Sequence, residues 1–177
     1  VHVSALGVRE KHISKYMQSK LQGEKNIKAT FKPSVILRPS LIFGPGDKFF
    51  NTFASLAQFC PVLPLIGGGK TKFAPIYVGN VAKAIVKALE LNNSEPKIYE
   101  LGGPENYSFK ELMEILLIEI KKKRFLISIP FAAAKLQSYF LQMLPNPLLT
   151  PDQVDMLKYN NIVSGDHLTL KDLGITG

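Results

Sequence analysis

Strand-like and helix-like stretches alternate along this chain, and that alternation limits the folds open to it more than any other feature. Buried strands are predicted at 1–6 (VHVSAL), 34–43 (SVILRPSLIF) and 97–103 (KIYELGG), because each is a short and largely apolar run. Apolar strands separated by helical patterns are typical of a parallel sheet that is covered on both faces. The sequence therefore predicts an α/β fold with a mainly parallel sheet.

The segments between these strands have helical periodicity. The stretch 81–91 (VAKAIVKALEL) places its apolar residues on one face, which we expect to pack on the sheet: Val81, Ala84, Ile85, Ala88 and Leu89. Two further helices begin at capping boxes, in which a hydroxyl residue is followed three positions later by Glu or Gln. These pairs are Ser108 with Glu111 and Thr150 with Gln153.

Composition restricts the class of protein and its partners. The 177 residues are 46% hydrophobic, which is enough for a buried core in one domain or a domain and a half. Lys and Arg exceed Asp and Glu by 22 − 14 = 8. Phosphate-bearing partners fit this charge, but the excess is mostly lysine and we expect no nucleic acid partner. Cys60 is the only cysteine, which excludes an internal disulfide and a zinc cluster built from thiols. No metal site is predicted.

A basic run at 121–124 (KKKR) follows the helical pattern that starts at Ser108. Such a run could bind nucleic acid. Cations at a helix C-terminus are, however, favoured by the helix dipole. We therefore interpret the run as the solvated end of a helix.

Two glycine-rich stretches resemble phosphate-binding loops without completing either motif. In GPGDKF, at 44–49, Phe49 stands where a dinucleotide fingerprint needs its third glycine. In PLIGGGKT, Pro64 replaces the first glycine of a P-loop. What remains is a predicted flexible hinge at Gly67–Gly69 that carries Lys70 and Lys72. These lysines either approach a phosphate or belong to a mobile loop.

Tyr16 and Lys20 are the strongest candidates for chemistry. Residues four apart on a helix share one face, so the ammonium of Lys20 is expected to lower the pKa of the Tyr16 phenol toward neutrality. Ser4, at the end of the first predicted strand, reaches the same space if the helix packs beside that strand. Its hydroxyl could then donate to a substrate carbonyl while Tyr16 transfers a proton. A surface pair with no catalytic role is the alternative.

Several motifs resemble the second half of an extended short-chain dehydrogenase/reductase. They are VHVSALG, YMQSK, GEK, ILRPSLIFGPGD, PIYVGNVAKAI and YELGGPENYSFKELMEIL. The resemblance implies a catalytic triad of Ser4, Tyr16 and Lys20, with Lys20 also holding the nicotinamide ribose. It places the stretch Arg38, Pro39, Ser40 and Leu41 beside the nicotinamide. It also implies that Lys70 and Lys72 approach the diphosphate of a nucleotide-linked substrate.

Within that family, four segments resemble the NAD(P)H-binding accessory subunit of respiratory complex I (NADH-ubiquinone oxidoreductase) and its bacterial relatives. These are SKYMQSKLQGEK, DKFFNTFASLA, PVLPLIGGGK and LTPDQVDMLKYNNIV with LKDLGI. The resemblance implies a protein with little or no turnover that binds NAD or NADP and respiratory complex subunits. It implies a location in the cytoplasm, on the cytoplasmic face of the inner membrane, or on the matrix side. An active NAD(P)-dependent reductase, epimerase or dehydratase acting on a nucleotide-sugar or similar carbonyl substrate is the alternative, favoured by the intact triad.

The predicted domains follow from the resemblance. Residues 1–48 and 79–104 are expected to form the back half of a Rossmann-type domain. Residues 49–78 and 105–177 are expected to form a smaller, mostly helical substrate-type domain. Residue 1 already lies inside an apolar strand pattern, so we expect this chain to be the back part of a longer protein. Because the family's Gly-rich pyrophosphate turn lies upstream, we expect residues 1–177 to bind the dinucleotide weakly or not at all.

One further stretch allows for peripheral membrane association. The segment 130–145 (PFAAAKLQSYFLQMLP) combines Phe131, Lys135 and Gln142 with aliphatic residues and could form an interfacial amphipathic helix. The alternative is a helix that is buried in the core of the substrate-type domain. This alternative is favoured because apolar helical faces usually pack internally.

Overall fold

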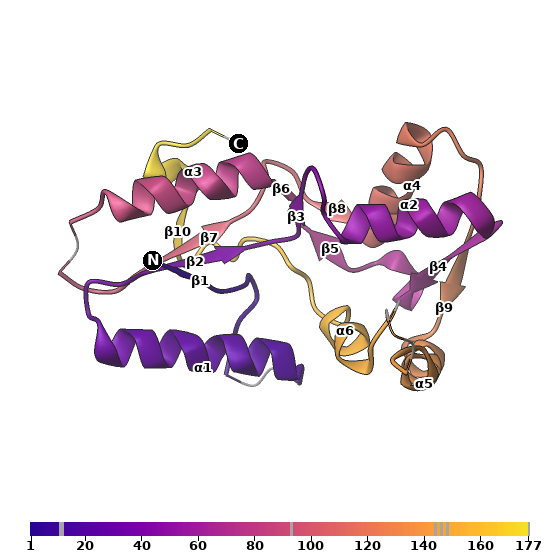
Figure 1. Cartoon of the computed structure of the whole chain (residues 1–177), viewed down its shortest axis with the longest axis horizontal. Helices are drawn as coiled ribbons and strands as arrows, with labels where there is room; N and C mark the ends of the chain where they lie inside the picture. Colours follow the sequence, from indigo (N-terminus) through magenta and orange to yellow (C-terminus); the bar gives the residue numbers. More distant parts are fainter. Residues whose placement is uncertain (11–12, 93, 144, 146, 148, 177) are drawn as a thin grey trace. The chain divides into compact units, whose positions relative to one another are not determined.

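The computed structural model describes residues 1–10, 13–92, 94–143, 145, 147 and 149–176 (Figure 1). It divides into two compact units. The first comprises Val1–Gly44, Phe73–Asn106 and Asn161–Gly177, and the second comprises Pro45–Lys72 and Tyr107–Asn160. Residues 161–177 thus belong to the first unit, whereas the sequence pattern assigns them to the smaller domain.

A four-stranded parallel sheet forms the centre of the first unit. Its strand order is β1 (His2–Val3), β2 (Val35–Pro39), β7 (Lys97–Leu101) and β10 (Leu168–Thr169). Every neighbouring pair is parallel. The predicted α/β class with a parallel sheet is therefore confirmed. The strand β10 has only two residues, which are too few to stand out in the sequence as an apolar run. Its pairing with β7 places residues 161–177 in this unit.

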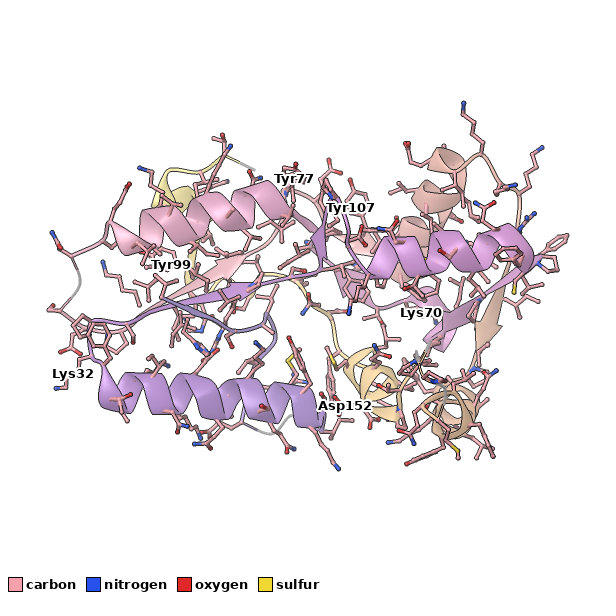
Figure 2. The ribbon with its side chains drawn as sticks, in the orientation of Figure 1. Lys32, Lys70, Tyr77, Tyr99, Tyr107 and Asp152 are labelled. Atoms are coloured by element: carbon pink, nitrogen blue, oxygen red, sulfur yellow. The ribbon has the colours of Figure 1, made fainter. Side chains whose placement is uncertain are left out.

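Helices cover both faces of this sheet, α1 (Lys15–Thr30) on one face and α3 (Val78–Leu89) on the other (Figure 1). Side chains alternate between the two faces along a strand. Val35 and Leu37 of β2 accordingly join the core beneath α3, together with Tyr99 of β7 (Figure 2). From α3 itself, Val81, Ala84 and Ala88 are buried in that core. Leu89, which the pattern places on the same face, is 69% exposed because α3 ends there.

The predicted strand at 34–43 is divided in the structure. After Pro39 the chain leaves the main sheet, and β3 (Ile42–Phe43) pairs in parallel with β6 (Ile76–Tyr77). Two short strands, β5 (Lys72–Phe73) and β8 (Tyr107–Ser108), stand where the chain passes between the units. The 3-10 helix η2 (Leu170–Leu173) follows β10 and adds Leu170 and Leu173 to the core beneath α3.

The second unit is built around two parallel strands, β4 (Val62–Ile66) and β9 (Phe125–Ile129). On one face Leu63 packs with Ala57 and Leu117, which belong to α2 (Phe49–Phe59) and α4 (Phe109–Glu119). On the other face Ile66 packs with Ala134 and Val154, which belong to α5 (Phe131–Leu141) and α6 (Pro151–Met156) (Figure 1). The predicted capping boxes at the starts of α4 and α6 are both confirmed.

The three glycines after β4, where the sequence predicts a flexible hinge, form a 3-10 turn, η1 (Gly67–Gly69). All three have positive φ, a region that glycine enters without steric cost. A Cβ at Gly67 would lie 2.3 Å from Cζ of Phe131, and one at Gly69 would lie 3.0 Å from the backbone nitrogen of Lys110. Gly67 and Gly69 therefore require glycine, because their φ is positive and a Cβ would overlap with neighbouring atoms.

We predict that Gly67→Ala destabilises the second unit by about 1–3 kcal/mol more than Gly46→Ala does, because it adds steric overlap to conformational strain. Gly46 is a matched control in the same unit, since it also has positive φ but a Cβ there would meet nothing within 4 Å. Urea unfolding of both variants measures the difference. Equal losses of unfolding free energy in the two variants would show that overlap with Phe131 does not contribute.

Candidate functional site

Helix α1 brings Tyr16 and Lys20 together beside the end of β1. The helix begins after Ser14, whose hydroxyl accepts a hydrogen bond from the Met17 N–H. The Lys20 Nζ lies 5.7 Å from the centroid of the Tyr16 ring. It also donates a hydrogen bond of 3.2 Å to the carbonyl oxygen of Val3. The pair predicted from the sequence therefore shares one helical face that adjoins the strand.

Ser4 follows directly after β1 and is almost fully buried. Its N–H donates to Leu37 O at 2.8 Å, which extends the pairing of β1 with β2 by one residue. Within the described residues its hydroxyl makes no hydrogen bond of normal geometry. The hydroxyl faces the carboxylate of Glu24 closely enough to favour the ionised form of that group. Ser4 is thus close to α1, but its hydroxyl is not hydrogen-bonded to Tyr16 or Lys20.

The electrostatics of Tyr16 differ from expectation. Its side chain is about half-buried, and this burial raises the pKa of the phenol above its ordinary value of 10.0. The expected lowering of the pKa by Lys20 is therefore wrong. The ammonium lies over the ring and is hydrogen-bonded to a backbone carbonyl, a position in which it makes a cation–π contact.

Arg38 is engaged in a buried ion pair. Strand alternation turns it to the α1 face of the sheet, where its Nε and Nη2 donate to the two carboxylate oxygens of Glu24 at 2.8 and 2.7 Å. Both side chains are less than 10% exposed. The remaining terminal nitrogen, Nη1, lies 3.2 Å from Nε2 of His167 and 3.9 Å from Oε1 of Glu100. The guanidinium that the resemblance placed at a nicotinamide thus binds α1 to the sheet.

Glu24 stands one helical turn beyond Lys20, and its charge is stabilised by this pair. Burial alone raises the pKa of a carboxyl group, but the hydrogen bonds from Arg38, the proximity of Ser4 and the charges of Arg38 and Lys28 outweigh it. The net effect holds the pKa of Glu24 below its ordinary value. Glu24 was missed from the sequence, although its position four residues after Lys20 is a usable signal.

Glu100 completes the charged layer on this face. The parallel register pairs it with Arg38 across β2 and β7. Its Oε2 accepts hydrogen bonds from the N–H of Ser164 at 2.6 Å and from the hydroxyl of Ser164 at 2.8 Å. His167 must accept at Nε2, since a guanidinium can only donate. The segment before β10 is thereby attached to the same buried cluster.

The remaining residues expected near a nicotinamide have structural contacts of their own. The hydroxyl of Ser40 lies 2.7 Å from Oδ1 of Asn161 and accepts from the Ala74 N–H at 3.2 Å. The Asn161 amide donates to Leu6 O at 2.8 Å, and Leu6 N–H donates to Pro39 O at 2.9 Å. Asn161 was also missed from the sequence, because a single Asn far along the chain gives no local signal.

Leu41 is half-buried, and its carbonyl oxygen accepts a hydrogen bond from the Ile76 N–H at 2.9 Å.

Lys70 and Lys72 belong to the second unit, whereas Ser4, Tyr16 and Lys20 belong to the first. Lys70 follows the glycine turn and is exposed (Figure 2). The Lys72 N–H donates to Oδ1 of Asn160 at 2.9 Å, while its side chain is also exposed.

Two other kinds of feature are absent from the described residues. No group of three or more His, Cys, Asp or Glu side chains is arranged to hold a metal ion in this part of the chain. Among the helices that the structure describes, none is both long enough and apolar enough to cross a membrane.

The buried pair makes stability depend on pH. Because the folded-state pKa of Glu24 is lowered, its stabilisation is present above the ordinary pKa of 4.5 and is lost as the pH falls through the folded value. We predict that Glu24→Gln lowers the free energy of unfolding at pH 7 by about 3–5 kcal/mol, because it removes the carboxylate that accepts two hydrogen bonds from the buried Arg38. The variant should then lose less stability than the wild type on acidification. Urea unfolding from pH 7 downward measures both, and parallel pH profiles would contradict the assignment.

Comparisons with known proteins give the family. The model of the 3-beta hydroxysteroid dehydrogenase/isomerase family matches residues 5–107. NADH dehydrogenase (ubiquinone) 1 alpha subcomplex subunit 9, mitochondrial, of Arabidopsis thaliana is 34% identical over 185 residues, which cover 99% of this chain and 46% of the relative. The protein of the same name in Mus musculus is 32% identical, over 99% of this chain and 47% of its own length. This chain spans about half the length of the curated relatives it matches.

Solved structures agree with the observed fold. The UDP-glucuronic acid 4-epimerase from Bacillus cereus matches 98% of this chain and 58% of its own, with a TM-score of 0.58 and 21% identity. The structure of gox2253 matches 93% of this chain and 57% of its own, with a TM-score of 0.61 and 19% identity. The parallel sheet is thus that of a Rossmann-like fold. The chain belongs to the 3-beta hydroxysteroid dehydrogenase/isomerase family, among the extended short-chain dehydrogenases/reductases.

Proposed function

We propose that this protein is an NAD(P)(H)-binding accessory subunit of an NADH-ubiquinone oxidoreductase complex, with little or no turnover of its own. The observation that carries the proposal is the similarity over 99% of the chain to relatives named as subunits of that complex. They come from a plant, a mouse and Dictyostelium discoideum. On this proposal its partners are other subunits of the complex. On this proposal it lies in the cytoplasm, at the cytoplasmic face of the inner membrane, or on the mitochondrial matrix side.

The residues at the end of β1 fit the nicotinamide side of a dinucleotide. The phenol of Tyr16 is accessible, and Lys20 carries an ammonium on the same helical face. The ammonium donates a hydrogen bond to Val3 O in this structure. It can instead donate to the hydroxyl oxygens of a ribose, which also accept hydrogen bonds. The buried hydroxyl of Ser4 faces the carboxylate of Glu24 without a hydrogen bond of normal geometry, and its oxygen can accept one. A bound dinucleotide supplies hydride chemistry, whereas these residues bind and orient it.

The state of Tyr16 supports binding rather than proton transfer. A general acid or base works best with a pKa near the working pH. Burial moves the pKa of the Tyr16 phenol in the opposite direction, upward from 10.0. Arg38, which the resemblance placed at the nicotinamide, is already paired with Glu24. The proposed contacts to the dinucleotide from this chain are therefore those of Tyr16 and Lys20, with Pro39, Ser40 and Leu41 forming the adjoining backbone.

An active NAD(P)-dependent reductase, epimerase or dehydratase is the second candidate function. One observation favours it. Ser4 lies at the end of β1, and Tyr16 and Lys20 lie on the face of α1 that packs beside that strand. On that alternative, Lys70 and Lys72 serve a phosphate-bearing substrate. The two candidates differ in what the Tyr16 hydroxyl does, and a single substitution separates them.

Tyr16→Phe removes one hydroxyl and keeps the ring beneath Lys20. We predict that the whole protein with this change still co-purifies with the respiratory complex from native membranes, in wild-type amount, because a binding role needs the ring and the ammonium. Tyr77→Phe is the matched control, since Tyr77 is equally exposed in the same unit. Quantitative mass spectrometry of the purified complex is the measurement.

The opposite result identifies the alternative. If the wild-type protein reduces or epimerises a carbonyl substrate, Tyr16→Phe should lower kcat by at least about a hundredfold through loss of the acid–base group. Such a loss, together with no co-purifying respiratory subunits in the wild type, would contradict the proposed function.

A further inference from the structure

The strand β9 is paired along one edge only. It pairs in parallel with β4, and these two strands form a sheet of their own among the described residues. Figure 1 shows β4 on one side of β9 and no strand on the other. An unpaired strand edge presents backbone N–H and C=O groups that can pair with another chain. We call the edge of β9 that faces away from β4 the open β9 edge.

The backbone of Leu126 and Ser128 points to the open β9 edge. The Phe125 N–H donates to Pro61 O at 3.0 Å, so the backbone groups of Phe125 face β4. Successive residues of a strand alternate in the direction of these groups, which turns those of Leu126 and Ser128 away from β4. Neither residue hydrogen-bonds through its backbone to another described segment. Their N–H and C=O groups are therefore available to a further strand.

The outer edge of β4 is protected, whereas the open β9 edge is not. By the same alternation Pro64, three residues after Pro61, faces away from β9, and proline has no N–H to offer to a further strand. The five residues of β9, FLISI, include neither a proline nor a charged side chain. Isoleucine and phenylalanine also favour the strand conformation. Of the two outer edges of this sheet, only that of β9 accepts a new strand.

One face of β9 is also left partly uncovered. Ile129, at the end of the strand, packs in the core formed with α5 and α6. Phe125 and Ile127 lie on the same face by alternation, yet they are 76% and 50% exposed. The helices thus cover the end of this face and leave its beginning exposed.

Helix α5, which follows β9, is itself buried on one side only. The sequence places the segment 130–145 either at an interface or in the core of the substrate-type domain. Ala134 is buried in the core of the second unit, whereas Leu136 and Phe140 on the opposite side of the helix are exposed. Residue 144 of this segment lies outside the described residues. The core alternative therefore holds for one face of α5.

We propose that the open β9 edge binds the same edge of a second copy of this chain, antiparallel and about a two-fold axis at Ile127. In this register Ile127 lies opposite its own counterpart, and Leu126 lies opposite Ser128 of the second copy. Opposite residues in an antiparallel pair alternate between pairs that exchange two hydrogen bonds and pairs that exchange none. Leu126 and Ser128 form the bonded pairs, so every outward donor of one copy meets an acceptor of the other.

The side chains fit the same register. Phe125 lies opposite Ile129 of the second copy, and the two copies of Ile127 form the central pair, in which side chains approach most closely. Aromatic and β-branched residues that face each other across two strands stabilise the pairing. The exposed beginning of each apolar face is thereby covered by the other copy.

The basic run at 121–124 does not oppose this pairing. Lys121 and Lys123 are exposed, as expected for the solvated end of a helix. Because the two strands run in opposite directions, Lys123 is in register with Phe131 of the second copy and not with a cation. Like charges are therefore not brought opposite each other at the proposed interface.

The proposed dimer is closed and weak. A two-fold contact uses the same surface on both copies, and Pro64 keeps the other edge of the sheet from extending the array. The exposed surface of Phe125 and Ile127, with the neighbouring backbone, amounts to roughly 400 Å² per copy, about half of a standard interface. The inference concerns the second unit alone, so it does not depend on dinucleotide binding or on a place in a respiratory complex.

Sedimentation equilibrium of the 177-residue chain tests the proposal, in about 0.15 M salt to screen the repulsion between chains of charge +8. Between about 10 and 500 µM we expect the dimer fraction to rise with concentration. Ile127→Lys should raise the dissociation constant at least about tenfold, because two cations then lie opposite each other. Ile118→Lys is the matched control, since Ile118 is 73% exposed in the same unit but belongs to α4. It should stay within about threefold of the wild type.

A mixture of opposite charges tests the register. Ile127→Glu should weaken its own dimer as Ile127→Lys does. An equimolar mixture of the two variants should form a heterodimer at least about tenfold tighter than either homodimer, because opposite charges then face each other. A fluorescent label on one variant identifies the heterodimer in the centrifuge.

A backbone substitution tests the hydrogen bonds. Ser128→Pro removes the outward N–H and leaves the groups that face β4, whereas Ser128→Ala keeps that N–H. Only the proline variant should lose the dimer. Thermal unfolding checks that each variant is folded, and the Ser128 pair decides the matter if a charged variant is not.

Four results would overturn the proposal. One is a chain that stays monomeric over the whole concentration range, which would leave the open β9 edge to a strand of a different protein. Others are an equal effect of Ile127→Lys and Ile118→Lys, and a charged mixture that stays monomeric. The last is the formation of open-ended oligomers, which would require the outer edge of β4.

Discussion

The buried pair between Glu24 and Arg38 is the interaction on which the rest of the candidate site depends. A guanidinium and a carboxylate taken out of water stabilise a fold only if their geometry is close to ideal. Here the pairing is bidentate, at 2.8 and 2.7 Å, and Arg38 contacts Glu100 and His167 with its remaining terminal nitrogen. The pair joins the second half of α1 to the centre of the sheet. That attachment sets which face of α1 meets β1.

The position of Tyr16 and Lys20 follows from this attachment. Glu24, Lys20 and Tyr16 are spaced one helical turn apart, so fixing the first on the sheet turns the other two toward the end of β1. Lys20 then reaches Val3 O, one residue before Ser4. The same face of α1 therefore carries Glu24, whose buried charge stabilises the fold, and the side chains of Tyr16 and Lys20, which a ligand can reach. On the proposed function, this division separates the residue that holds the helix from the residues that bind the dinucleotide.

The sequence predicted the parallel sheet and the helices well because their signals are local. Apolar runs, helical spacing and the capping boxes at Ser108 and Thr150 each depend on a few neighbouring residues, and the structure confirms them. What the sequence missed depends on partners far along the chain. The pairing of Arg38 with Glu24 joins residues of two different elements, and no local pattern indicates it. The strand β10 has only two residues, and its pairing with β7 is what returns residues 161–177 to the first unit.

A double-mutant cycle on the buried pair tests the central claim most directly. The variants are Glu24→Leu, Arg38→Met and both together, with the free energy of unfolding measured in urea. Each single substitution should cost about 3–5 kcal/mol, because it leaves a buried charge without its bidentate partner. The double variant should cost less than Arg38→Met alone and well below the sum, because Glu24 is then no longer buried without a cation, while the loss of Arg38 beside Glu100 is common to both variants. Additive losses in the double variant would contradict the claim that this pair attaches α1 to the sheet.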